Sequence, residues 1–111
     1  MTPVPVRLDI RSTIAEIVLD RPEKRNALSI GMWAAIPGLV AEAVADQTVK
    51  TILLHGGTAG AFAAGADISE FEEIYATPET AASSGDTIAA ALMALETCEK
   101  PVIAAIEGAC V

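Results

Sequence analysis

The segment that decides the fold is Phe62-Ala63-Ala64-Gly65-Ala66-Asp67-Ile68, a run of small residues that ends in an aspartate and an isoleucine. Small side chains leave the backbone N–H groups accessible, and an aspartate at this place can cap a helix. Backbone N–H groups at the start of a helix lie near the positive end of its dipole, which suits a developing oxyanion. The segment therefore predicts a strand-to-helix turn whose backbone donors hold negative charge.

Composition limits the class of protein. The chain has 111 residues, of which 52% are hydrophobic and only 4% aromatic. This length suits one domain, and a core of Ala, Val, Ile and Leu suits thin helices packed on a buried sheet. The net charge of −8 argues against nucleic acid and anionic membrane surfaces as partners, because both need clustered Lys and Arg.

The chain shows no targeting, membrane-spanning or metal-binding pattern. Residues 1–6 lack the basic and long apolar regions of a signal peptide, and the longest apolar run, residues 30–45, is too short to span a bilayer. Cys98 and Cys110 have neither metal nor disulfide spacing. We expect them to be reduced, buried thiols in a cytoplasmic protein.

Hydrophobic periodicity predicts an α/β fold with a largely parallel sheet. A hairpin opens the chain, a polar loop covers residues 20–26, and Ser29 is the expected cap of the first helix. Pro37 is expected to kink or split that helix, and Gly85 to interrupt a later one. The strands are expected at residues 4–10, 14–19, 51–54 and 102–106, the last two buried on both faces, and the helices at 29–46, 68–75 and 77–98.

Several polar residues invite a catalytic interpretation but favour a structural one. Asp67 is expected to be a helix cap, and the acidic residues 70, 72 and 73 a solvated helix face. His55 ends an apolar strand with no nucleophile beside it, so we expect it to be packed and hydrogen-bonded. The glycine-rich residues 56–60 lack the Lys-Ser/Thr ending of a phosphate-binding loop, which favours a simple connection.

Three segments in order resemble one enzyme superfamily. They are Leu19-Asp20-Arg21-Pro22-Glu23-Lys24-Arg25-Asn26-Ala27-Leu28, Ala61-Phe62-Ala63-Ala64-Gly65-Ala66-Asp67-Ile68 and Lys100-Pro101-Val102-Ile103-Ala104-Ala105-Ile106-Glu107-Gly108. Together they resemble the N-terminal half of the enoyl-CoA hydratase/isomerase (crotonase) superfamily. The resemblance implies a ClpP/crotonase-like spiral of ββα units, with residues 1–111 as the N-terminal part of the core domain. It also implies trimers or hexamers of the full-length protein.

The resemblance also implies a reaction. The family holds an acyl-CoA thioester carbonyl between two backbone N–H groups, and the first of these matches Ala66. The second would come from glycines that follow Val111, and the catalytic glutamates would lie beyond Gly108. The expected activity is therefore that of a hydratase or isomerase, such as hydration of a 2-enoyl-CoA, with the 111-residue chain inactive alone. Coenzyme A enters as part of the substrate, and no separate cofactor is implied.

The same resemblance places the substrate contacts. Matching positions for the coenzyme A moiety and the thioester are Lys24, Arg25, Ala27, Ala64, Gly65, Asp67 and Ile68. Many members carry a lysine just after the position of Ile68, whereas this chain has Ser69. That departure removes one expected contact to the nucleotide of coenzyme A.

Two alternatives remain open on the sequence. Residues 108–111 are small, apolar and directly follow a strand, which we interpret as the end of a fragment. The chain is then either part of an acyl-CoA enzyme or a non-catalytic remnant that self-associates, because uncovered apolar surface favours association. A mononucleotide-binding α/β domain is a third, weaker hypothesis, and it predicts phosphate binding at residues 56–60.

Overall fold

The computed structural model describes residues 4–111, which build a four-stranded mixed sheet. Strand β1 (Val6–Arg11) pairs antiparallel with β2 (Ile14–Leu19), and β3 (Thr51–His55) lies parallel to β2. Strand β5 (Val102–Ala105) continues the sheet parallel to β3, which gives the order β1-β2-β3-β5. This topology confirms the predicted hairpin and the parallel crossovers.

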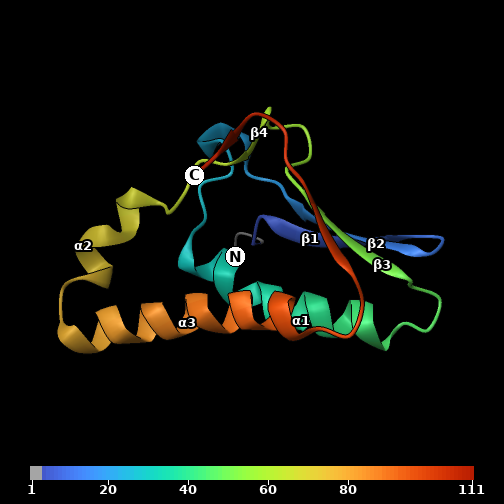
Figure 1. The fold of residues 1–111 in the computed structure, drawn as a ribbon. Helices are drawn as coiled ribbons and strands as arrows, with labels where there is room; N and C mark the ends of the chain where they lie inside the picture. Colours follow the sequence, from blue (N-terminus) through green and yellow to red (C-terminus); the bar gives the residue numbers. More distant parts are fainter. Residues whose placement is uncertain (1–3) are drawn as a thin grey trace.

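Two long helices cover one face of this sheet (Figure 1). Helix α1 (Ile30–Ala45) begins where the Ser29 side chain accepts a hydrogen bond from the Met32 N–H. Helix α3 (Pro78–Thr97) begins at Thr77, whose side chain and that of Thr80 form a reciprocal capping box. The structure thus confirms the predicted starts of both long helices.

The expected split of the helix at Pro37 is wrong, and so is the expected interruption at Gly85. Both α1 and α3 run through these residues without a break. Tertiary packing explains the continuity of α1, because its residues Met32, Ile36 and Val40 are buried in the core. Burial of an apolar face stabilises a helix more than one unfavourable residue destabilises it.

The core lies between the helices and one face of the sheet. Its largest fully buried apolar side chains include Ile17, Met32 and Ile52. The described residues put no helix on the opposite face, so β5 is mostly exposed and Ile103 remains 54% exposed. The prediction that β5 is buried on both faces is therefore wrong for this chain, whereas every residue of β3 is buried or half-buried.

A second, two-stranded sheet brings the small-residue segment beside the last residues. Strand β4 (Ala61–Ala63) pairs parallel with β6 (Ala109–Cys110), and the Val111 N–H donates to the Ala63 carbonyl at 3.0 Å. Figure 1 shows this sheet at one end of the molecule, beside the C-terminus. Short connecting helices complete the fold: η1 (Pro22–Lys24), η2 (Ile68–Glu70) and α2 (Phe71–Ile74).

The cysteines differ in part from expectation. Both are free thiols, but Cys98 is half-buried and Cys110 is exposed. Cys110 lies on β6, which pairs only with the short β4, so little covers it. Within residues 4–111, no helix has the length and apolarity needed to cross a bilayer.

Candidate functional site

Ala66 sits beside the start of α1 with its own backbone N–H uncommitted. It forms a parallel bridge with Leu28, in which the Leu28 N–H donates to the Gly65 carbonyl at 2.8 Å and the Asp67 N–H to the Leu28 carbonyl at 3.0 Å. In such a bridge the central residue directs its own N–H away from its partner. Within residues 4–111 the Ala66 N–H donates to no protein acceptor, and the residue is exposed.

The turn before Ala66 needs glycine. Gly65 has a φ of +104°, a conformation that side chains with a Cβ rarely adopt. On the other side of the turn, the Ala64 N–H donates to the Arg25 carbonyl at 3.0 Å. The turn is therefore anchored to two earlier segments, at Arg25 and at Leu28, which fix the direction of the Ala66 N–H.

Asp67 is the cap of η2, as predicted. Its Oδ1 accepts from the Ser69 N–H at 3.0 Å and from the Ser69 hydroxyl at 2.6 Å, while Arg21 Nη1 lies 2.9 Å from its Oδ2. Hydrogen bonds from Ser69 and Arg21 lower the pKa of Asp67 to about 2. Both carboxylate oxygens of Asp67 thus accept hydrogen bonds from protein groups. The structure gives no support for the expected contact between this side chain and the substrate.

The short helix expected after Asp67 is present, and it consists of η2 and α2, which together span residues 68–74. So short a helical segment contributes little dipole, and the anion-holding property of the turn rests on the free N–H itself. The predicted solvated acidic face is wrong at Glu70, which is half-buried and accepts from the Ile30 N–H at 2.9 Å, and so caps α1.

Asn26 organises the site, although its segment was expected to be only a polar loop. Its side chain is completely buried and donates from Nδ2 to the carbonyls of Gly56, Ala61 and Phe62 at 2.9–3.2 Å. Its Oδ1 accepts from the Arg21 N–H at 2.8 Å. A polar residue in a loop carries no burial signal, so only the tertiary contacts reveal this role.

The loop residues expected to contact coenzyme A lie next to the turn. Lys24, Arg25, Ala64 and Ile68 are exposed, whereas Ala27 and Gly65 are half-buried. The Arg25 carbonyl bonds the Ala64 N–H, so the two segments are adjacent. The structure therefore places the backbone of the loop that carries Lys24 and Arg25 next to the turn that carries Ala66.

An apolar pocket of about 150 Å³ opens beside Ala66. Its walls come from the start of α1, from α2 and from the first half of α3, with Leu28, Trp33, Phe71 and Ile88 among the lining residues. Asp67, Glu70 and Ser84 add polar groups to this lining. An apolar lining with a few polar groups is the chemistry of a small-molecule site.

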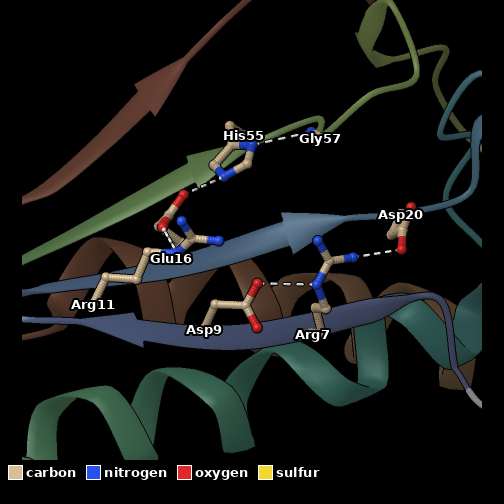
Figure 2. Close-up of polar contacts among 7 residues, drawn as sticks. All are labelled: Arg7, Asp9, Arg11, Glu16, Asp20, His55 and Gly57. Atoms are coloured by element: carbon tan, nitrogen blue, oxygen red, sulfur yellow. Dashed lines mark hydrogen bonds and ion pairs between the residues drawn. The ribbon is translucent and has the colours of Figure 1, made fainter.

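His55 lies apart from this site, on the open face of the sheet. Figure 2 shows its ring between Glu16 and Gly57. The Gly57 N–H donates to Nδ1 at 3.0 Å, so Nε2 carries the proton and donates to Glu16 Oε1 at 2.8 Å. Arg11 holds the other oxygen of Glu16 at 3.1 Å. Both ring nitrogens are occupied, which confirms the prediction of a packed histidine.

Comparison with known proteins decides the family. The family profile of enoyl-CoA hydratase/isomerase matches residues 9–111. The chain belongs to this family. Enoyl-CoA hydratase ACTT3 of Alternaria alternata is 39% identical over 99 residues, which cover 88% of this chain and 32% of that protein. A peroxisomal dienoyl-CoA isomerase of Arabidopsis thaliana is 30% identical and covers 96% of this chain and 41% of its own length.

Solved structures confirm the crotonase fold. A family member from Hyphomonas neptunium superposes with a TM-score of 0.94 at 72% identity, covering 96% of this chain and 40% of its own. An enoyl-CoA hydratase/carnithine racemase from Magnetospirillum magneticum gives a TM-score of 0.88 at 35% identity. This chain therefore spans about two fifths of the length of these solved relatives.

Proposed function

We propose that the chain binds an acyl-CoA and polarises its thioester carbonyl through the Ala66 N–H. This polarisation would contribute to a hydratase or isomerase reaction. One observation carries the proposal: the Ala66 N–H donates to no acceptor within residues 4–111, Ala66 lines an apolar pocket, and backbone bonds to Arg25 and Leu28 anchor the turn around it. A donor fixed before substrate arrives needs no reorganisation in the transition state.

The chemistry needs this donor because negative charge develops on the thioester oxygen. Hydration at C3 and proton removal beside the carbonyl both pass through an enolate-like oxygen. One donor in such a site contributes about 2.7–4 kcal/mol, or roughly 10²–10³ in rate. The carboxylate of the nearby Glu70 accepts a hydrogen bond from the Ile30 N–H, so we do not propose it as the general acid or base. We therefore expect residues 1–111 alone to bind acyl-CoA without turning it over.

Cationic and small residues support the coenzyme A part of the proposal. The exposed Lys24 and Arg25 stand next to the turn and provide positive charge for phosphate groups in an otherwise acidic chain. The backbone at Ala64, Gly65 and Ile68 is close enough in sequence to Ala66 to contact the same ligand. Coenzyme A is part of the substrate in this proposal, so no separate cofactor is needed. We also propose that the longer protein is cytoplasmic and assembles as a trimer or hexamer.

A second candidate function is a non-catalytic chain that self-associates and binds acyl-CoA. It is favoured by the exposed apolar side chains near the end of the chain, Ile103 (54%), Ile106 (57%) and Val111 (89%). Neighbouring exposed apolar groups favour association in water. Sedimentation velocity of the purified chain separates the candidates, because a concentration-independent monomer contradicts self-association.

The test of the first proposal removes one N–H. Butyryl-CoA is titrated calorimetrically into the wild-type chain, into Ala66→Pro, which lacks the donor, and into Ala66→Gly, which keeps it. We expect the proline variant to bind at least tenfold more weakly and the glycine variant to stay within about threefold of wild type. Circular dichroism checks that both variants fold. Equal affinity of a folded Ala66→Pro variant contradicts the proposal.

A further inference from the structure

The side chain of Arg21 links the loop before α1 to the turn that carries Ala66. Its Nη1 lies 3.0 Å from the Ala27 carbonyl oxygen and 2.9 Å from Asp67 Oδ2. An Nη nitrogen carries two hydrogens in the plane of the guanidinium, so one nitrogen can donate to two acceptors in fixed directions. The guanidinium therefore ties residue 27 to residue 67.

The two acceptors of Arg21 lie on either side of the backbone bridge at Ala66. Leu28 follows the first acceptor in the chain, Asp67 contains the second, and Leu28 pairs with Ala66 in an isolated parallel bridge. Within that bridge the Asp67 N–H donates to the Leu28 carbonyl at 3.0 Å. An isolated bridge lacks the neighbouring ladder bonds that hold a residue within a sheet. The guanidinium supplies a further tie immediately after Ala66.

Arg21 is itself held firmly enough to act as such a tie. Its backbone N–H donates to Oδ1 of the fully buried Asn26 at 2.8 Å, and its carbonyl accepts from the Asn26 N–H at 2.9 Å. Its ion pair with Asp67 is the least exposed of those among residues 4–111. A charge-assisted hydrogen bond that is shielded from water is stronger than an exposed one.

The other arginine ion pairs of the sheet differ in exactly this respect. Arg7 and Arg11 bond carboxylates on the open face of the sheet, where Figure 2 shows them, and both arginines are exposed. Exposed pairs of this kind contribute little to stability. Arg11 therefore offers a matched control, since it carries the same charge in an ion pair away from Ala66.

We propose that Arg21 is a positioning residue for polarisation of the thioester carbonyl. This inference rests on the proposed binding of an acyl-CoA at Ala66. By holding Asp67 against the segment that contains Leu28, Arg21 keeps the Ala66 N–H in one direction before the substrate arrives. Hydrogen bonds weaken steeply as the donor angle falls below about 120°, so a donor that swings polarises the carbonyl less. Arg21 acts through the backbone of Ala66 and does not itself bind the substrate.

Infrared difference spectroscopy tests the effect on the carbonyl. Butyryl-CoA labelled with ¹³C at the thioester carbonyl is bound to the wild-type chain, to Arg21→Gln and to the control Arg11→Gln. We expect the labelled carbonyl band to move to lower frequency in wild type and in Arg11→Gln, and to lose most of this shift in Arg21→Gln. Circular dichroism checks that each variant folds. A wild-type band shift in a folded Arg21→Gln overturns the inference and leaves the proposed function standing.

Calorimetry on the same variants separates positioning from general damage to the site. Arg21→Gln should bind butyryl-CoA about three- to tenfold more weakly than wild type, and coenzyme A itself within about twofold of wild type. The affinity for coenzyme A is preserved because the backbone N–H groups of Lys24 and Arg25, rather than the Arg21 side chain, hold that loop. Equal losses for the two ligands overturn the inference. Absence of any carbonyl shift in wild type overturns the proposed function, and the inference with it.

A further measurement needs no ligand, so it tests the inference apart from the proposed function. NMR relaxation gives the order parameter of the Ala66 N–H, which should be about 0.85 in wild type and below about 0.6 in Arg21→Gln. Should Arg21→Gln not fold, Asp67→Asn takes its place. The asparagine keeps an oxygen for Ser69 but presents an N–H donor to the guanidinium, so the order parameter should fall in the same direction. An Ala66 N–H that stays rigid in the folded variant, or that is mobile in wild type, overturns the inference.

Discussion

Arg21 Nη1 lies 2.9 Å from Asp67 Oδ2 and 3.0 Å from the carbonyl oxygen of Ala27, so a single guanidinium joins two segments 46 positions apart in the chain. The two side chains are only 18% and 7% exposed, which shields the pair from water. Asp67 directly follows Ala66. The position of the free backbone N–H therefore depends on a charged residue in a loop that precedes α1.

This pair makes the stability of the chain sensitive to acid. Ser69 and Arg21 lower the pKa of Asp67 from 3.8 to about 2, so the folded state holds the proton less readily than the unfolded state does. The resulting stabilisation, on the order of 2 kcal/mol, is fully present above about pH 4 and disappears as the pH falls through about 2. Urea unfolding at pH 6, 4, 3 and 2 measures this loss.

A matched pair of variants isolates the contribution of Asp67. Asn at this position keeps the capping oxygen but no longer titrates, so Asp67→Asn should be less stable at pH 6 and lose less stability below pH 4 than wild type does. Asp86→Asn changes an exposed carboxylate on α3 and serves as the control. Identical pH slopes for wild type and Asp67→Asn contradict the assigned role of the pair.

The buried amide of Asn26 predicts a large effect of substitution. Asn26→Ala leaves the Arg21 N–H and three carbonyl groups without this partner, one in a buried and three in partly buried positions. Each unsatisfied buried group is unfavourable by about 1–3 kcal/mol, so we expect a loss of at least 3 kcal/mol in the free energy of unfolding. The urea midpoint measures it.

The control for Asn26 is Gln47→Ala, which removes an exposed amide. It should change the free energy of unfolding by less than about 0.5 kcal/mol. Comparable midpoints for Asn26→Ala and Gln47→Ala would show that the buried amide does not hold the site together.

Two glycines in different surroundings predict effects of opposite sign. A Cβ at Gly56 would overlap the Ala61 carbonyl oxygen, whereas a Cβ at Gly85, inside α3, would meet nothing within 4 Å. Gly56→Ala should therefore destabilise the chain by several kcal/mol or prevent folding. Gly85→Ala should stabilise it by about 0.5–1 kcal/mol, because alanine is the better helix former. Thermal unfolding of both variants provides the measurement, and a stabilising Gly56→Ala contradicts the packing described here.

Local signals in the sequence predicted the regular elements well. Alternation of apolar residues indicated the hairpin, and Ser29 and Thr77 indicated where the long helices begin. The errors came from positions where packing outweighs local preference. Pro37 lies in a helix whose apolar face is buried, so the helix continues through it. The β5 strand has a buried composition, yet the described residues cover only one face of it.

The candidate site was predictable only in part. The small residues and the helix-capping aspartate around Ala66 predicted the turn, and the family resemblance proposed Ala66 as the donor. The role of Asn26 was not predictable, since its partners Gly56, Ala61 and Phe62 are 30–36 positions away. The role of Arg21 was equally invisible, because the pairing of distant side chains is a property of the folded chain.

The sequence by itself determined the order of the long helices and of the strands of the main sheet, which follows from periodicity and caps that act over a few positions, and its three motifs indicated the family. The tertiary structure alone decided that the Ala66 N–H is free within residues 4–111, and that Asn26 and the Arg21–Asp67 pair hold it in place. Each of these depends on which atoms meet across distant segments, and only folding brings them together.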